Sequence, residues 1–240
     1  MRGPNKKGSD VELHWHLQED NLFSDLPEAV REDFLARSSR REIRKKEFLF
    51  FEDDPGEHCY YLETGAVRIF RFTAMGKEPI IFIRKAGEIF GLAEVLDGQN
   101  RKCNAQAVSA CVVHALSKAD LETLLECHPA FSRRLISILG KRVRYLGEQV
   151  ENLMVGTVAT RLMKIFLYLS MEAIKDAGTK GEQVNVPISL SQADFASLTG
   201  SCQQTISETM KQLQAEGFIR MNKREIVLLN PEKLLERLYE

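Results

Sequence analysis

One predicted helix near the C-terminal end of the chain carries side chains that can bond to the edges of DNA bases. The helix is expected to begin at Ser201 and to run to Glu216, with Gly217 ending it. The face opposite its apolar positions presents Gln203, Gln204, Ser207 and Glu208. Glutamine can bond adenine at N6 and N7, serine can bond several base edges, and glutamate can accept from cytosine N4. We therefore predict that these four residues contact bases in the major groove of double-stranded DNA. The spacing of Ser201 and Gln204 also fits a capping box, which is the alternative role for Gln204.

Cationic side chains around this helix are suited to phosphate contact, which positions a protein on DNA without reading its sequence. Two apolar runs, Phe218–Met221 and Ile226–Leu229, flank a polar tetrapeptide and predict a β-hairpin with two cations at its tip. The expected phosphate contacts are Lys211, Arg220, Lys223 and Arg224. From residue 156 onward the chain holds ten Lys/Arg and ten Asp/Glu. DNA binding must therefore depend on where the cations lie and not on a general positive field.

A pair of helices joined by a sharp turn is expected to position these side chains. The first helix begins at Ser191, and Gly200 ends it. Ala196 provides a small residue where the helices cross, and Ile206 provides an aliphatic side chain on the buried face of the second helix. The small core is completed by Leu198, Met210 and Leu213. With the hairpin that follows, this pattern predicts a winged helix-turn-helix.

A long helix is predicted from Pro129 to about Val155, before a hinge at Gly156-Thr157. Its apolar residues recur in a heptad-like pattern at Leu135, Leu139, Val143, Leu146, Val150 and Leu153. A helix with one narrow apolar stripe usually pairs with a copy of itself. We therefore predict a homodimer held along this helix; the alternative is a helix that only packs on the rest of its own chain.

Residues 41–117 alternate apolar and polar positions in short runs that turn residues separate, which predicts a β-barrel or sandwich. The runs are Phe48–Phe51, His58–Glu63, Ala66–Phe72, Pro79–Arg84 and Val108–Leu116. Helices are expected before and after them, at Pro27–Arg37 and Lys118–Cys127. The predicted fold class is α+β, with an N-terminal double-stranded β-helix (jelly-roll) barrel, a long central dimerisation helix and a C-terminal winged helix-turn-helix. The expected boundaries are a flexible tail at 1–21, the barrel domain at 22–127, the dimerisation helix at 128–155 and the winged domain at 156–240.

The composition of the 240-residue chain is ordinary for a globular protein, with 44% hydrophobic and 28% charged residues and a formal net charge of -1. No apolar run approaches the roughly 18 residues of a membrane-spanning helix, and the first ten residues are too polar for a signal peptide. The five cysteines form no C-x-x-C pair, so reduced thiols are expected. These features predict a cytoplasmic protein without a membrane segment.

Three stretches carry a family resemblance: Tyr60–Val67, Ala86–Gly91 and Leu198–Ser207. With the order of barrel, long helix and winged helix, the chain resembles the CRP/FNR family of bacterial transcription regulators over roughly residues 22–230. The resemblance implies a cyclic-nucleotide-binding-type barrel, an allosteric homodimer, a near-palindromic promoter site and RNA polymerase as the protein partner. It also implies that the protein is not an enzyme.

The resemblance places the effector pocket at Gly91, Leu92, Glu94, Arg101, Lys102 and Leu146. Members that bind cyclic AMP have a glutamate at the Leu92 position, an Arg-Ser or Arg-Thr pair at Arg101-Lys102, and a Thr-Ser pair at Leu146-Gly147. These three departures make cyclic AMP an unlikely effector. Arg101 is the best candidate for an anionic ligand; the alternative is an exposed salt bridge to Glu94 or Asp97, worth at most about 1 kcal/mol.

The other cofactors of the family depend on residues at particular positions of the chain. The iron–sulfur branch needs an N-terminal cysteine cluster, but no cysteine precedes Cys59, so such a cluster is not expected. The carbon-monoxide-sensing haem branch has Cys and His where this chain has Gly91 and Ala93. Haem held by other histidines stays an open alternative, with His14, His16, His58, His114 and His128 available. Cys103 and Cys111 are either oxidant sensors or inert packing residues.

Two rival functions have weaker support. A cyclic-nucleotide-binding regulatory subunit that acts on a protein partner would need the missing ribose and phosphate ligands, and it would leave the winged helix without a role. A cupin-like metalloenzyme would need clustered ligands, but residues 41–117 contain no H-x-H pattern. The favoured mechanism is a population shift in which a signal at the barrel changes the placement of the two winged domains through the long helix.

Overall fold

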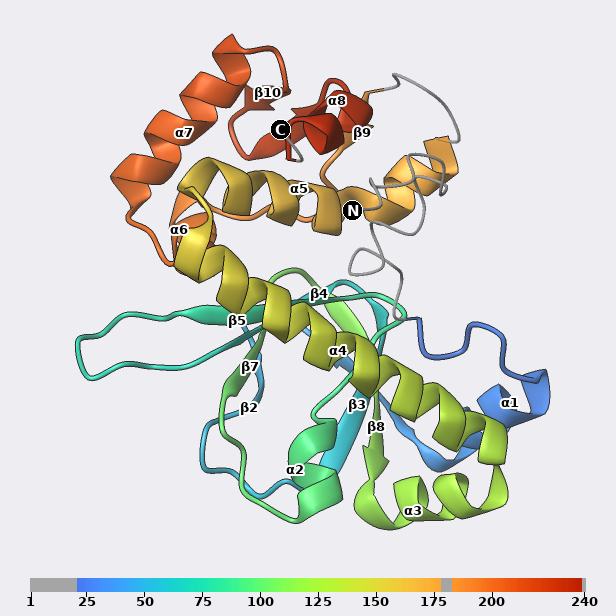
Figure 1. Cartoon of the computed structure of the whole chain (residues 1–240). Coiled ribbons are helices and arrows are strands. Elements are labelled where there is room, and N and C mark those ends of the chain that lie inside the picture. Colours follow the sequence, from blue (N-terminus) through green and yellow to red (C-terminus); the bar gives the residue numbers. More distant parts are fainter. Residues whose placement is uncertain (1–20, 178–182, 239–240) are drawn as a thin grey trace, which may run out of the picture.

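The computed structural model describes residues 21–177 and 183–238 of the chain. The predicted flexible tail, apart from residue 21, lies outside the described residues, as do His14 and His16. Figure 1 shows a strand-rich body and a mostly helical body, joined by one long diagonal helix, α4 (Pro129–Val155). Within the described parts of the chain, no helix combines the length and the apolarity needed to cross a membrane.

The strand-rich body is a barrel of two four-stranded antiparallel sheets. The first sheet, in spatial order, consists of β1 (Ser39–Ile43), β8 (Cys111–Ser117), β3 (His58–Thr64) and β6 (Ile89–Phe90). The second consists of β2 (Phe48–Phe50), β7 (Asn104–Ala107), β4 (Ala66–Phe70) and β5 (Ile80–Lys85). Side chains from both sheets, including Leu62, Val67 and Val113, share one core. Because strands distant in sequence pair with each other, this topology confirms the predicted jelly-roll barrel.

Helices pack against one end of the barrel, where α4 begins. They are α1 (Glu28–Arg37) and α3 (Lys118–Cys127), and a short helix α2 (Leu92–Asp97) follows β6. Phe34, Leu121 and Phe131 are fully or almost fully buried in the cluster that these helices form with the barrel. Each of the two longer helices was predicted from sequence, and Ser117 caps α3 by accepting from the backbone N–H of Asp120 at 3.2 Å.

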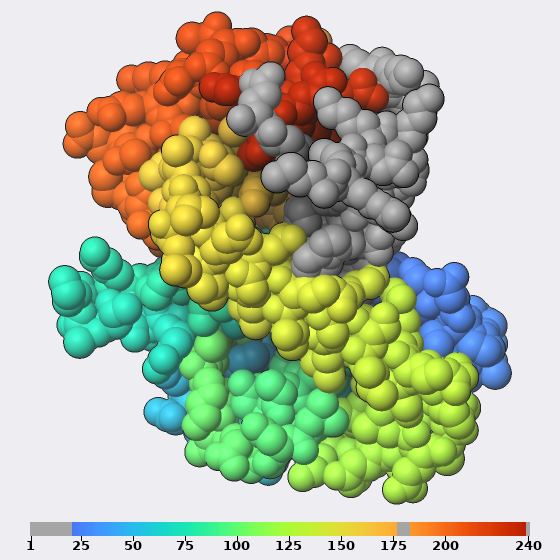
Figure 2. All heavy atoms as spheres, viewed as in Figure 1, coloured from blue at the N-terminus to red at the C-terminus, as the bar shows by residue number. Residues whose placement is uncertain are grey.

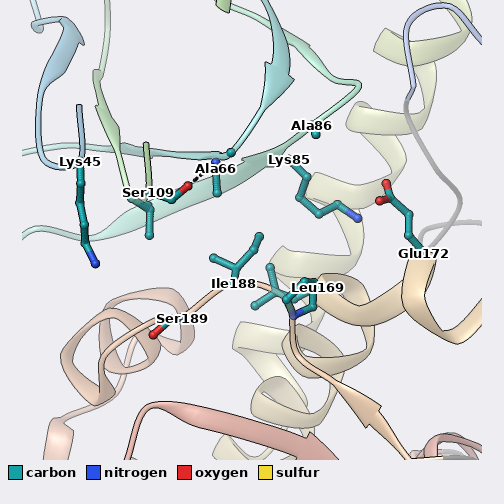
Figure 3. A pocket seen from close by; sticks show the side chains of 12 residues that line it. Lys45, Ala66, Lys85, Ala86, Ser109, Leu169, Glu172, Ile188 and Ser189 are labelled. Carbon is teal, nitrogen blue, oxygen red and sulfur yellow. Dashed lines mark hydrogen bonds between the residues drawn. The ribbon is translucent and has the colours of Figure 1, made fainter. Parts of the chain in front are cut away.

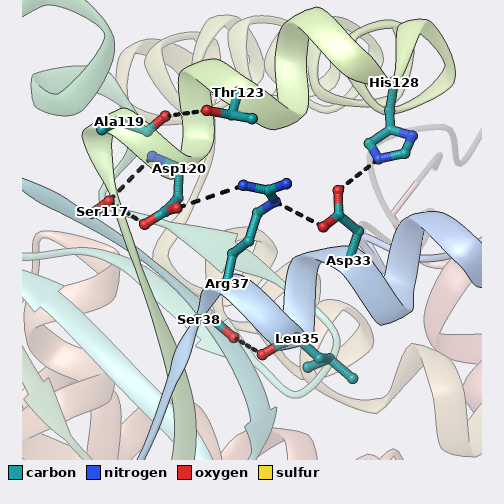
Figure 4. A network of polar contacts seen from close by, with 9 residues as sticks. All are labelled: Asp33, Leu35, Arg37, Ser38, Ser117, Ala119, Asp120, Thr123 and His128. Carbon is teal, nitrogen blue, oxygen red and sulfur yellow. Dashed lines mark hydrogen bonds and ion pairs between the residues drawn. The ribbon is translucent and has the colours of Figure 1, made fainter.

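A polar network joins α1, α3 and the start of α4, as Figure 4 shows. Arg37 Nε donates to Asp33 at 2.8 Å, and Arg37 also lies 3.9 Å from Asp120. His128, the residue before α4, bonds Asp33 through Nε2 at 2.9 Å. The hydrogen bond from His128 is the main cause that lowers the pKa of the Asp33 carboxyl, and Arg37 adds to it. The network thus fixes where the long helix leaves the barrel.

The long helix α4 carries two apolar stripes instead of one. Its inner stripe, Phe131, Leu135 and Ile138, is buried against the barrel. The prediction that Leu135 belongs to the dimer seam is therefore wrong, because this side chain is only 3% exposed within one chain. Ile136, at 69% exposure, takes its place in an outer stripe that continues through Leu139, Val143, Leu146, Val150 and Leu153.

The helical body is the winged domain. Its elements are α5 (Val158–Ala177), β9 (Val184–Asn185), α6 (Gln192–Thr199), α7 (Gln203–Ala215), β10 (Ile219–Asn222), β11 (Glu225–Leu228) and α8 (Pro231–Glu236). The three strands form a sheet in the order β10-β11-β9. Phe166 of α5 and Phe195 of α6 meet edge to face with ring centres 5.3 Å apart, above Ile206 and Met210 of α7. The described elements confirm the predicted winged helix-turn-helix.

Candidate nucleic-acid interface and sensor pocket

The turn between α6 and α7 sets the direction of the polar helix face. Ser191 caps α6 in a capping box with Asp194, and Gly200 ends the helix with a positive φ of 63°. The backbone N–H of Ser201 donates to the carbonyl of Ala196 at 3.0 Å, which closes the turn. Cys202, not Ser201, occupies the N-cap position of the second helix, and no side chain makes a capping hydrogen bond there. The alternative capping-box role for Gln204 is therefore wrong.

The outer face of α7 carries the predicted base-contacting residues. Gln203, Gln204 and Glu208 are exposed and Ser207 is half-buried, while Ile206 of the same helix is fully buried. Gln204 Nε2 donates to Glu208 Oε1 at 3.1 Å. A glutamine amide has a second N–H and a carbonyl oxygen, so Gln204 can keep this bond and still bond adenine N7 and N6. The pair also gives Glu208 a partner, which the sequence alone did not indicate.

A thiol that the sequence analysis did not single out lies at the start of the same helix. Cys202 is exposed, and its sulfur lies 3.1 Å from the hydroxyl of Thr205. Hydrogen bonding from Thr205 is the main cause that lowers the pKa of the Cys202 thiol. By contrast, burial raises the pKa of Cys59 to about 12 and also raises the pKa values of Cys103 and Cys111. The inert-packing alternative therefore fits Cys103 and Cys111 better than oxidant sensing does.

The predicted phosphate-binding cations lie on exposed positions of α7 and of the hairpin. Strands β10 and β11 pair up to Asn222 and Glu225, so Lys223 and Arg224 form the two-residue turn at the hairpin tip. Lys223 adopts a positive φ of 56° there. Lys211 is exposed on α7, and Arg220 of β10 bonds the Gln183 side chain at 3.0 Å. The structure thus separates a polar helix face from a basic hairpin tip within one domain.

Two cationic side chains, Arg161 and Lys164, stabilise the bend between α4 and α5. Arg161 Nη1 donates to the carbonyls of Asn152 and Gly156, at 3.2 and 2.8 Å. Lys164 Nζ donates to Asn152 Oδ1 at 2.6 Å. These cations satisfy carbonyl groups at the end of α4, where a positive charge is favourable. At the predicted hinge, Gly156-Thr157, these hydrogen bonds therefore hold the chain in a fixed bend.

The end of α4 also approaches the turn of the helix pair. A Cβ atom added at Gly200 would lie 3.4 Å from a methyl carbon of Leu153. Leu153 is the last member of the outer stripe, so this stripe and the turn of the helix pair are neighbours.

At the predicted effector pocket, Arg101 fills the site with its own side chain. It is 1% exposed, and its guanidinium donates to Glu94 at 3.1 Å, to the carbonyl of Gly91 at 2.9 Å and to the carbonyl of His58. The guanidinium also lies 4.2 Å from the centre of the Phe50 ring. The alternative of a salt bridge to Glu94 is correct, but the expectation that the pair is exposed is wrong. A buried pair with backbone partners is costly to break, unlike a surface pair.

The other predicted pocket residues divide into two groups. The backbone N–H of Lys102 donates to Glu94 at 3.4 Å, so Lys102 lies at the same cluster with its side chain exposed. Leu92 is 2% exposed and packs in the core beside α1, α3 and α4. Leu146 is exposed on the outer stripe of α4. The structure therefore gathers Gly91, Glu94, Arg101 and Lys102.

Aromatic rings and the paired Arg101 side chain occupy the barrel interior where the family resemblance places the effector. The rings of Phe50, Tyr60 and Phe90 stack inside it, with neighbouring centroids 5.4 to 6.5 Å apart. The arginine that would bind the cyclic phosphate already donates to Glu94 and two carbonyls, and the missing ribose glutamate has no replacement at Leu92.

Of the three histidines among the described residues, His114 and His128 have polar side-chain partners and His58 is exposed. His114 Nε2 bonds Glu63 at 2.7 Å and Nδ1 bonds Ser38 at 3.3 Å, while His128 is engaged by Asp33. His58 is exposed at the start of β3. Across residues 21–177 and 183–238, no group of three or more His, Cys, Asp and Glu side chains could hold a metal ion.

A buried polar network connects the barrel, α4 and the winged domain. Glu88, in the turn before β6, bonds Arg84 of β5 at 3.1 Å and lies 3.9 Å from Arg142 of α4. The Tyr168 hydroxyl of α5 donates to Glu88 at 3.3 Å. Beside it Tyr145 of α4 contacts the Tyr168 ring, and burial raises the pKa of Tyr145 to about 12. One carboxylate thus has partners in all three parts of the chain.

Comparison with known families agrees with this architecture. A family model described as cyclic nucleotide-binding domain matches residues 40–128, and one described as Crp-like helix-turn-helix domain matches residues 160–237. The two models together span well over half of the chain. They coincide with the barrel and with the winged domain, and the region between them is α4.

Relatives and solved structures support the same assignment. The CRP-like cAMP-activated global transcriptional regulator of Mycobacterium tuberculosis is 24% identical over 190 residues, which cover 79% of this chain and 83% of that protein. The probable transcriptional regulator flp of Lacticaseibacillus casei is 25% identical over 213 residues, or 89% and 93% of the two chains. FixK2 from Bradyrhizobium japonicum shares the fold with a TM-score of 0.70 and 24% identity, covering 83% of this chain and 96% of that one. The relatives from Mycobacterium tuberculosis and Lacticaseibacillus casei are transcriptional regulators by name.

Proposed function

The chain belongs to the CRP/FNR family of transcription regulators, and we propose that it acts as a homodimer on an inverted-repeat DNA site. In this proposal the barrel domain (22–127) receives a signal, residues 128–155 join the two copies, and the winged domain (156–240) binds promoter DNA beside RNA polymerase. The carrying observation is the exposed polar face of α7 next to the basic tip formed by Lys223 and Arg224. A recognition helix in the major groove and a cationic tip over the backbone are the two contacts such a domain needs.

The outer stripe of α4 supports the homodimer. Ile136, Val143, Val150 and Leu153 are 56–69% exposed in the single chain. With Leu139 and Leu146 they recur at alternating spacings of three and four, which is the seam of a two-stranded coiled coil. Figure 2 shows α4 as a yellow-green ridge on the surface between the two domains. A two-fold axis along this ridge would set the recognition helices about one DNA turn, roughly 34 Å, apart.

The signal in this proposal is not cyclic AMP. Its support is the buried Arg101, whose two terminal nitrogens already bond Glu94 and the carbonyls of Gly91 and His58. A ligand would have to displace these bonds and leave Glu94 without its cation. The signal that controls the protein is then a small molecule, gas or redox change that acts on the barrel without binding Arg101. The buried Glu88 network, which has partners in α4 and α5, would carry the change to the winged domain.

We expect cyclic AMP to leave the thermal unfolding midpoint of this protein unchanged at a concentration of about 1 mM. A ligand present at 100 times its dissociation constant would stabilise the native state by about 2.7 kcal/mol, which a thermal melt detects readily. The cAMP-activated regulator of Mycobacterium tuberculosis serves as the positive control. A clear rise of the unfolding midpoint with cyclic AMP would contradict the proposal that the Arg101 side chain blocks the site by bonding Glu94.

Replacing Gln204 with alanine is expected to change the preferred bases, whereas replacing Lys223 should weaken binding to all sequences alike. Loss of a bidentate base contact costs about 1–3 kcal/mol of discrimination at one position. Loss of a phosphate contact lowers the slope of log K against log salt by about 0.9. The measurement is selection of bound DNA from a random pool, followed by salt titration on the selected site.

Two matched variants control this experiment. Gln212 forms the same kind of bond to Glu216, at 2.7 Å, near the other end of α7, so Gln212→Ala should leave base preference unchanged. Lys77, exposed between β4 and β5, controls for the loss of one surface charge. If Gln204→Ala and Lys223→Ala lose affinity in parallel on every sequence, the division into base and phosphate contacts is wrong.

A further inference from the structure

A cavity of about 360 Å³ lies between the barrel and the winged domain. The barrel contributes Lys45, Lys85 and Ser109 to its lining, and the winged domain contributes Leu169, Glu172 and Ile188. Figure 3 shows the side chains of both domains facing one another across this space. The cavity shares no lining residue with the Arg101 site, so it is a separate place where a ligand could act.

The lining combines an apolar wall with hydrogen-bond donors. Leu169 and Ile188 form the wall on the winged-domain side, opposite Ala66 and Val108 of the barrel. The Lys85 ammonium donates to the carbonyl of Tyr168 at 3.2 Å, which uses one of its three N–H groups. The Ser109 hydroxyl accepts from the backbone N–H of Ala66 at 3.0 Å, which fixes this polar side chain at the barrel wall of the cavity.

The charge around the cavity favours an anion. The lining holds two lysines, Lys45 and Lys85, and one carboxylate, that of Glu172, and the chain neighbours Arg44 and Lys46 are also cationic and exposed. In Figure 3 Lys85 and Glu172 point toward one another, while Lys45 stands at the opposite end of the cavity. An anionic group near Lys45 would therefore meet a charged donor and positive charge, with an apolar body resting on Leu169 and Ile188.

We propose that this cavity binds a small organic anion with an apolar body, and that the bound anion holds the barrel and the winged domain in one arrangement. Ile188 lies on the segment that leads into Ser191, the cap of α6. A ligand that contacts both sides binds only arrangements in which the two walls are correctly spaced, so it shifts the population toward them. The proposed function names no ligand site between the domains, so this inference goes beyond it. Ligand binding at this cavity can be measured without DNA.

The test uses 1-naphthaleneacetate and its neutral amide as matched probes, with methyl NMR signals of the full chain as the readout. We expect the carboxylate to shift the signals of Leu169 and Ile188 with a dissociation constant on the order of 1 mM, as about 14 heavy atoms at modest ligand efficiency allow. The amide should bind at least about fivefold more weakly, because it lacks the charge-assisted bond. Ile188→Trp, which fills the cavity, should abolish the Leu169 shift.

Lys45→Gln keeps the proposal testable if the tryptophan variant does not fold. Lys45 is exposed, and its loss should weaken the carboxylate about fivefold, while Lys77→Gln should have no effect. Equal binding of acid and amide, shifts that persist in Ile188→Trp, or no shift up to about 20 mM would each overturn the proposal. DNA selection with the ligand-free protein tests the proposed function separately, so the two failures can be told apart.

Discussion

Replacing Val143 and Val150 with aspartate is expected to convert the protein to a monomer and to remove its preference for inverted-repeat DNA. Both side chains are more than half exposed in the single chain and lie one heptad apart on the outer stripe. Four valines per dimer would lose about 1.5 kcal/mol of burial each, so the dimer dissociation constant should rise at least about 1000-fold. Sedimentation measures the oligomeric state, and competition between one and two half-sites measures the DNA preference.

Val155→Asp provides the matched control for this experiment. Val155 is 79% exposed on the same helix but lies off the outer stripe, so its replacement should leave the dimer intact. A double variant that stays dimeric, or a wild-type protein that is monomeric at micromolar concentration, would contradict the proposed seam. The double variant at Val143 and Val150 is expected to lose specific DNA binding by about 100-fold or more, since a single winged domain retains only half of the contacts.

Replacing Glu88 with glutamine is expected to lower the free energy of unfolding by about 3–5 kcal/mol. The side chain keeps its shape but loses its charge, so Arg84 is left in a buried site without a carboxylate, and Arg142 loses a nearby one. Arg84 is only 6% exposed and Glu88 only 3%, so water cannot replace the lost interaction. Urea unfolding followed by circular dichroism measures the loss.

The exposed pair of Glu52 and Arg71 gives the control. Its N–O distance is 2.6 Å, but the arginine side chain is 56% exposed. Glu52→Gln should therefore cost no more than about 1 kcal/mol. If the two variants are equally stable, the Glu88 network is not the buried junction that the structure indicates.

Helix ends were predictable from sequence because local hydrogen bonds determine them. Pro129 fits the first turn of a helix, and Ser117 and Ser191 can cap the helices that follow them. The predicted bounds of α3 and α4 agree with the structure for this reason. Strand β1 (Ser39–Ile43) was missed because an edge strand with four exposed residues has no apolar alternation to detect.

The division of α4 into two faces could not be obtained from spacing alone. Leu135 and Ile136 both start series with steps of three and four, and only the barrel decides which series is covered. The same limit applies to Arg101. Its position was identified, but its burial depends on the carbonyl groups of Gly91 and His58, which the barrel topology brings together. Contacts between residues distant in sequence are not encoded in any local pattern.

The hydrogen bonds from Arg161 and Lys164 to Asn152 hold the bend between α4 and α5, so α4 would move together with the winged domain as one rigid unit. Its 27 residues extend over about 40 Å. A tilt of about 5° at the barrel end would displace the far end by about 3.5 Å, close to the ~3.4 Å rise of one base pair. In the proposed dimer, a small repacking around Glu88 would then move each recognition helix out of register with its half-site. The length of α4 would determine how far each recognition helix moves.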